Sequence, residues 1–153
     1  MHDTSRARIR PDGRQSESAN RIARGVRRLL RELKYSSILE LDLPDGRRAD
    51  VVGLHCDGTL LIVEIKSSPE DLRADKKWRE YRLHCDRLYF AISDSMSNDI
   101  MPEDAGLIVA DAYGAAIVRD AETHRIPPAT RRGITLRFAQ TAANRLYRSH
   151  DLG

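Results

Sequence analysis

The sequence predicts an α/β protein in which helices flank a mixed β-sheet. Two observations support this fold class. Apolar residues recur at helical spacing near both ends of the chain, and they alternate at strand spacing between them. The expected order is helix, three meandering strands, helix, strand, hairpin and helix, and a meander followed by a helical crossover gives a mixed sheet. The 153 residues suffice for one domain with its own core.

The first helix is expected to begin at Ser16, with Ser16 or Ser18 as its cap. One face carries apolar residues, and the other is rich in arginine. The preceding residues, 1–15, are polar and basic, which predicts a mobile N-terminal segment before a single domain over residues 16–150.

Three strands follow as a continuous meander, over residues 36–43, 48–55 and 59–67. Residues with turn chemistry separate them, at Pro44-Asp45-Gly46 and Cys56-Asp57-Gly58. The next helix is expected to run to about His84, because Ser68 can cap it and Pro69 suits its first position.

The second half of the chain is expected to extend the sheet and close with a helix. Residues 87–93 form a strand, and residues 105–111 and 115–120 form an extra hairpin. The final helix covers about residues 129–147. Its buried side is expected to carry Ile134, Phe138, Ala142 and Leu146.

The net charge of +3 is unevenly distributed. Residues 1–34 hold ten arginines and lysines against four acidic residues. The last helix adds a second basic group, Arg131, Arg132, Arg137, Arg145 and Arg148. Arginine binds phosphate through two donors at once, so these helices are expected to hold a nucleic-acid backbone, with a solvated helix face as the alternative.

Several classes of protein are excluded by what the sequence lacks. It has no apolar run that could span a membrane and no N-terminal secretory signal. Its two cysteines and five histidines show no metal-ligand spacing, and no phosphate-cradling glycine loop is visible. Reduced thiols and the missing signal indicate a cytoplasmic protein.

The hairpin over residues 47–66 carries three charged residues at positions where a strand pattern calls for apolar ones: Asp50, Glu64 and Lys66. A three-residue loop with Gly58 in the left-handed position would place Asp50 opposite Glu64, with Cβ atoms about 4.5–5.5 Å apart. Lys66, two residues further, shares that face. A two-residue loop would instead separate the carboxylates.

Two carboxylates this close repel each other unless a cation lies between them. Oxygen ligands favour Mg²⁺ or Mn²⁺, and the backbone carbonyl of Ile65 could be a further ligand. Such a metal can activate water against a phosphodiester, with Lys66 as a base or as an electrostatic partner. The alternative is an ion-pair cluster with a purely structural role.

The spacing Asp50, Glu64-x-Lys66, preceded by a helix and followed by a helix and strand, resembles the PD-(D/E)XK nuclease superfamily. More closely, A-D-V-V-G-L, L-I-V-E-I-K-S-S and C-D-R-L-Y-F-A-I resemble the bacterial MmcB family of DNA repair proteins. The superfamily implies a restriction-endonuclease-like αβββαβ core, metal held by Asp50 and Glu64, and Lys66 as the catalytic lysine. Ala49 stands where the motif has proline.

The resemblance therefore implies a Mg²⁺- or Mn²⁺-dependent nuclease that hydrolyses DNA in bacterial repair. A non-catalytic DNA-binding or scaffold module and an RNA nuclease are the alternatives. The sequence leaves open whether the DNA is single-stranded, duplex or branched. It also leaves open whether the chain acts as a homodimer or with another repair protein.

Further site residues follow from the same resemblance. Glu17, near the start of the first helix, is a candidate metal ligand, although it also suits the helix dipole. Lys77 and Tyr81 are candidate substrate contacts, with a solvated lysine and a core tyrosine as the alternative. Independently of the resemblance, Ser67 could bind a phosphate or simply end the strand, and Arg24 and Arg28 on the basic first helix are candidate phosphate contacts. Lys77 and Tyr81 are expected to share one helix face, whereas Asp71 and Asp75 are expected at the surface.

Overall fold

The computed structural model describes residues 13–151. Its helical elements are α1 (Gly13–Glu32), α2 (Pro69–Ala74), η1 (Trp78–His84), η2 (Asn98–Ile100) and α3 (Pro128–Asp151), η1 and η2 being 3₁₀ helices. Its strands are β1 (Tyr35–Asp42), β2 (Arg48–His55), β3 (Leu60–Ile65), β4 (Arg87–Ile92), β5 (Gly106–Ala110) and β6 (Ala115–Arg119). The order is the one that the sequence predicts, except that α2 and η1 replace a single helix and η2 is additional.

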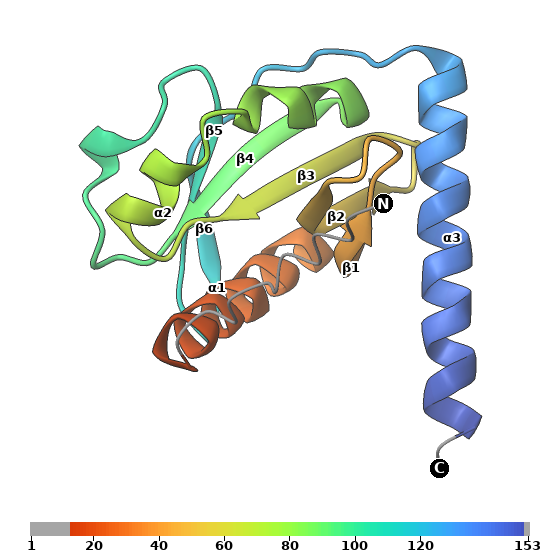
Figure 1. Ribbon diagram of the computed structural model, residues 1–153, viewed down its shortest axis with the longest axis horizontal. Coiled ribbons are helices and arrows are strands. Elements are labelled where there is room, and N and C mark those ends of the chain that lie inside the picture. Colours follow the sequence, from red (N-terminus) through yellow and green to blue (C-terminus); the bar gives the residue numbers. More distant parts are fainter. Residues whose placement is uncertain (1–12, 152–153) are drawn as a thin grey trace, which may run out of the picture.

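The six strands form one mixed sheet in the order β1-β2-β3-β4-β5-β6 (Figure 1). The first three strands are antiparallel, β3, β4 and β5 are parallel, and β6 returns antiparallel to β5. The crossover from β3 to β4 runs through α2 and η1. This arrangement confirms the predicted α/β class and agrees with a restriction-endonuclease-like fold.

Two hydrophobic cores cover the two faces of the sheet. On one face, Ile22, Val26 and Leu30 of α1 pack against β3, β4 and β5. On the other face, η1 and α3 pack against the alternate residues of the same strands. Side chains alternate between the faces of a strand, so every central strand is buried on both sides.

Helix α1 begins at Gly13, so neither Ser16 nor Ser18 precedes it as a cap. The predicted mobile segment, residues 1–15, lies outside the described residues apart from its last three positions, which belong to α1. Within residues 13–151, no helix is long and apolar enough to cross a membrane.

The helix predicted to run from Ser68 to His84 is divided into two. Ser68 caps α2 by accepting the N–H of Asp71, and Pro69 opens it, as predicted. The helix then ends at Ala74, and η1 follows. The buried residues of η1 recur every third position, at Trp78, Tyr81 and His84. A 3₁₀ helix has three residues per turn, so this spacing places all three side chains on the sheet.

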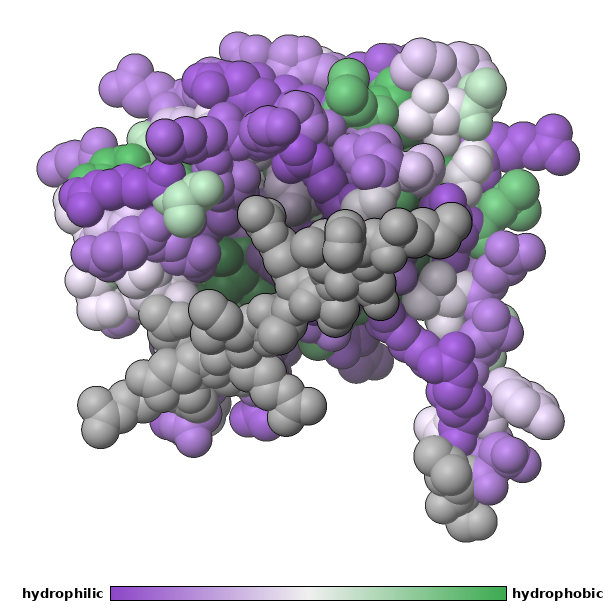
Figure 2. Space-filling view, in the orientation of Figure 1, coloured by the Kyte–Doolittle hydropathy of each residue, from purple (hydrophilic) through white to green (hydrophobic). Residues whose placement is uncertain are grey.

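Helix α3 is longer than predicted, and only its first half packs on the sheet. Ile134 and Phe138 are buried, Ala142 is half-buried, and Leu146 is 60% exposed. The last turns extend past the sheet, as Figures 1 and 2 show. The prediction of a buried Leu146 is therefore wrong, because helical periodicity does not reveal where the underlying sheet ends.

Three of the five arginines of α3 predicted to contact nucleic acid hold the helix in place, two of them through β1 and one through Asp86, just before β4. The guanidinium of Arg131 donates to both carboxylate oxygens of Asp86, at 2.5 and 2.6 Å. Arg145 donates to the carbonyl oxygens of Leu39 and Glu40 in β1. Arg137 makes a longer contact, 3.4 Å, with the carbonyl oxygen of Asp42. These contacts give the arginines a structural role.

Gly25 allows α1 to contact the β5–β6 turn directly. A Cβ at this position would lie 2.1 Å from the carbonyl oxygen of Asp111 and 2.4 Å from that of Gly114. Gly25→Ala is therefore expected to lower the free energy of unfolding by about 1–3 kcal/mol, the usual cost of overpacking. Urea denaturation measures this change.

Gly133 in α3 provides the matched control, since nothing lies within 4 Å of a Cβ there. Gly133→Ala is expected to stabilise the protein by about 0.5–1 kcal/mol through helix propensity. Equal effects of the two substitutions would contradict the close contact at Gly25.

Candidate functional site

The β2–β3 hairpin has the register that the sequence predicts. Gly58 is left-handed, with φ of 92°, and its N–H donates to the carbonyl oxygen of His55 at 2.9 Å. Val51 pairs with Val63, so Asp50 lies opposite Glu64. A slip of one residue would have moved Asp50 to the other face, so this turn creates the site.

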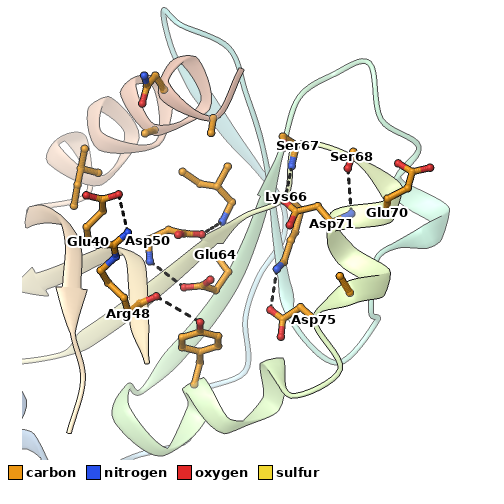
Figure 3. A pocket seen from close by; sticks show the side chains of 17 residues that line it. Glu40, Arg48, Asp50, Glu64, Lys66, Ser67, Ser68, Glu70, Asp71 and Asp75 are labelled. Carbon is orange, nitrogen blue, oxygen red and sulfur yellow. Dashed lines mark hydrogen bonds and ion pairs between the residues drawn. The ribbon is translucent and has the colours of Figure 1, made fainter. Parts of the chain in front are cut away.

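Two hydrogen bonds hold the carboxylates of Asp50 and Glu64, each donated by a backbone N–H of the neighbouring strand. The N–H of Asp50 donates to Glu64 Oε1 at 3.0 Å. The N–H of Ile65 donates to Asp50 Oδ2 at 2.8 Å. Figure 3 shows both carboxylates on the cavity wall where β2 begins and β3 ends. Each carboxylate is thereby fixed in position by the opposite backbone.

The electrostatics of the pair are unfavourable. Glu64 is only 3% exposed. Its pKa is raised well above the usual value, first by burial and then by the neighbouring Asp50 carboxylate. The pKa of Asp50 is also raised, chiefly by burial, although the N–H of Ile65 opposes the shift. The site therefore resists holding two negative charges unless a cation compensates them.

Lys66 is buried on the same side of β3, at 5% exposure. Its Nζ lies 2.8 Å from Asp75 Oδ2, directly after α2 (Figure 3). The expectation that Asp75 lies at the surface is therefore wrong. The chain segment between α2 and η1 turns this carboxylate inward, and no sequence pattern indicated that break in the helix.

Asp50, Glu64 and Lys66 line a cavity of about 900 Å³. Parts of α1, β1, β2, β3, α2 and η1 line it, and all of its lining residues lie between Ala19 and Tyr81. Its acidic lining residues are Glu40, Asp50, Glu64, Glu70, Asp71 and Asp75. A cavity with this lining attracts cations.

Of the other predicted site residues, three line this cavity: Ile65, Ser67 and Tyr81. The N–H of Ser67 contacts Asp71 Oδ2 at 3.3 Å. The Tyr81 ring is buried against the sheet, and burial raises the pKa of its hydroxyl. Tyr81 therefore forms part of the cavity floor as well as of the core.

Four predicted residues lie outside the cavity. Glu17 is exposed, and the turn of α1 that lines the cavity presents Ala19, Asn20 and Ala23 instead. Lys77 is exposed and immediately precedes η1. The face of η1 that carries Tyr81 repeats every third residue, so Lys77 does not share it. Arg24 and Arg28 line a separate groove.

Glu40 lines the cavity although it was not singled out from the sequence. It interrupts β1 with a left-handed backbone, φ 53°, and its carboxylate lies 3.4 Å from Arg48. Nothing in the alternating pattern of residues 36–43 signals this conformation. Within the described part of the chain, no group of three or more histidine, cysteine, aspartate or glutamate residues is arranged to hold a metal by itself.

The comparisons with known proteins agree with this fold. The chain is similar to a solved structure described as the SPO1766 protein of unknown function from Silicibacter pomeroyi. The two share 40% sequence identity with a TM-score of 0.85, over 88% of this chain and 92% of that one. No curated protein matches the sequence. The family model "DNA repair protein MmcB-like" matches residues 6–152, so the chain belongs to the MmcB-like DNA repair protein family.

Proposed function

We propose that the protein is a metal-dependent nuclease that hydrolyses DNA during bacterial repair. The main support is the convergence of Asp50, Glu64 and Lys66 on one acidic cavity at the end of the β2–β3 hairpin. Glu64 and Lys66 are buried and Asp50 is half-buried, and burying charges in this way is costly in a purely structural role. Membership of a DNA repair family supports DNA as the substrate.

The residues fit Mg²⁺ or Mn²⁺. One oxygen of each carboxylate, Asp50 Oδ2 and Glu64 Oε1, already accepts a backbone N–H. The second oxygen of each would bind the metal, with the Ile65 carbonyl as a further ligand. Mg²⁺ is commonly held by one or two carboxylates and completes its shell with water and substrate phosphate, so a third acidic side chain is not required.

A metal bound here would neutralise charge on the phosphodiester and activate water for attack. The protein's own contribution begins with orientation, because the backbone of each strand fixes the opposite carboxylate. Lys66, as an ammonium paired with Asp75, would place positive charge beside the scissile phosphate. This arrangement favours Lys66 as an electrostatic stabiliser of the transition state over a role as base.

A cleavage panel tests this proposal, using single-stranded, duplex, flapped and branched DNA and RNA with Mg²⁺ or Mn²⁺. Asp50→Ala and Lys66→Ala are each expected to slow cleavage by at least about 100-fold, the usual effect of removing a transition-state contact. DNA binding should remain. Glu103→Gln makes the same kind of change at an exposed position outside the cavity; it is the control and should retain activity.

Unchanged cleavage by both alanine variants would disprove the mechanism. If only RNA is cleaved, RNA replaces DNA as the proposed substrate. Salt-sensitive DNA binding without cutting of any substrate would favour a non-catalytic binding module.

A further inference from the structure

A second groove, of about 750 Å³, lies beside the cavity. Its lining consists of four arginines of α1, the start of β1 and the β5–β6 turn: Arg24, Arg27, Arg28, Arg31, Tyr35, Ser36, Ser37, Ala112 and Tyr113. Among these described lining residues there is no carboxylate. The groove therefore has the opposite charge to the acidic cavity.

Two of the arginines are held in place by neutral partners. Arg27 donates to the hydroxyl and the carbonyl of Ser37, both at 3.1 Å. Arg28 donates to the carbonyl oxygen of Tyr113 at 3.0 Å. These contacts orient the guanidinium groups without cancelling their charge, and pre-oriented arginines lose less entropy on binding phosphate.

Tyr113 projects from a fixed turn at the edge of this groove, and it is 80% exposed. Asp111 Oδ1 accepts the N–H groups of both Tyr113 and Gly114, at 2.8 and 3.0 Å. The direct contact with Gly25 secures the same turn against α1. A large aromatic ring that is rigidly supported and open to solvent is suited to stacking on an unpaired base.

The groove continues the cavity along the same two elements. In α1, Ala23 lines the cavity and Arg24 lines the groove. In β1, Leu39 and Glu40 line the cavity, whereas residues 35–37 line the groove. The two linings therefore adjoin on both elements. A strand that leaves the cavity reaches the arginines by passing over the Arg27–Ser37 contact that joins α1 to β1.

We infer that this groove binds a single strand of nucleic acid that continues from the cleavage site. Arg24 to Arg31 extend for about 10 Å along α1 at the helical rise. That length corresponds to about three nucleotides of a stacked strand. The arginines would contact phosphates, and Tyr113 would stack on a base. This inference deepens the proposed function by assigning a single-stranded segment to the substrate.

Fluorescence anisotropy of the full chain tests this inference, with a labelled oligothymidylate and a labelled duplex in EDTA, where no metal-dependent cleavage occurs. Tyr113→Ala is expected to weaken single-strand binding about tenfold, and Tyr113→Phe should bind like the wild type. The double variant Arg24→Ala/Arg31→Ala should weaken it at least tenfold. It should also reduce the slope of log affinity against log salt by about 1.4.

Arg125→Ala removes one charge from an exposed position outside the groove and should change affinity less than twofold. Thermal unfolding checks that each variant is folded. Unchanged single-strand affinity in the Tyr113 and double-arginine variants would overturn the inference even if the protein cuts DNA. If the variants lose single-strand affinity but the wild type cuts no substrate, the binding groove is supported and the nuclease proposal is rejected.

Discussion

Glu64→Gln is expected to make the metal-free protein more stable and, at the same time, unable to cut DNA. Glutamine keeps the Oε1 acceptor for the N–H of Asp50, and it removes a buried charge that lies next to a second carboxylate. Burying a charged carboxylate costs free energy, and the Asp50 carboxylate beside it adds to that cost, so removing the charge without changing the side-chain volume should stabilise the fold. For a chain of this size, each kcal/mol raises the midpoint of thermal unfolding by about 2–4 °C.

The stability of the wild type should fall as the pH rises, because of Glu64. The pKa of Glu64 is higher in the folded than in the unfolded chain. Its contribution to stability is therefore complete below the unfolded pKa and is lost as the pH rises through the folded pKa. Glu64→Gln should remove this part of the pH dependence. The free energies of unfolding of the wild type and of Glu64→Gln should therefore differ most at neutral and alkaline pH.

Thermal unfolding across pH, with EDTA or with Mn²⁺, measures both effects. We expect Mn²⁺ to stabilise the wild type and to leave Glu64→Gln nearly unchanged, since ligands stabilise only the state that binds them. Glu103→Gln makes the same chemical change at an exposed position outside the cavity and should behave like the wild type. A destabilised Glu64→Gln protein would indicate that the carboxylate is a structural ion-pair partner.

Asp86→Ala is expected to cost about 3–5 kcal/mol of stability, the range for removing one partner of a buried ion pair. Asp86 is 2% exposed and accepts hydrogen bonds from the N–H groups of Leu60 and Ile126. It also binds the guanidinium of Arg131. The substitution leaves all these donors without their carboxylate.

Urea denaturation measures the loss, and the surface pair of Arg79 and Asp104 provides the control. Asp104→Ala should cost less than about 1 kcal/mol because exposed ion pairs contribute little. Burial raises the pKa of Asp86, but hydrogen bonds from Arg131 and from the backbone of Leu60 lower it more. Its stabilisation is therefore present above the unfolded pKa and is lost as the pH falls through the folded one. Similar costs for Asp86→Ala and Asp104→Ala would show that the buried pair is not an anchor.

The sequence was sufficient where local chemistry determines geometry. Gly58 fixed the hairpin loop, and the loop fixed Asp50 opposite Glu64. Ser68 and Pro69 fixed the start of α2. Each of these features depends on a few neighbouring residues, so propensities and turn rules are sufficient to predict them.

The sequence was insufficient where distant segments meet. Asp75 binds Lys66 only because the helix breaks after Ala74. The left-handed backbone of Glu40 has no local cause such as glycine or asparagine, and Arg145, 105 residues later, donates to its carbonyl oxygen. The arginines of α1 and α3 look alike in the sequence. The structure distinguishes them. Arg131 binds Asp86 and Arg145 binds β1, whereas Arg24 and Arg28 line a groove.

The cavity and the groove that α1 lines carry opposite charges, which the net charge of +3 does not reveal. An acidic cavity and an arginine groove on neighbouring parts of one helix form a local dipole on the surface. Divalent cations are drawn to one pole, and phosphates are drawn to the other. Monovalent salt should therefore weaken nucleic-acid binding at the exposed groove more than it weakens metal binding at the buried carboxylates. Nucleic-acid binding should thus depend on monovalent salt, and cleavage on the divalent cation.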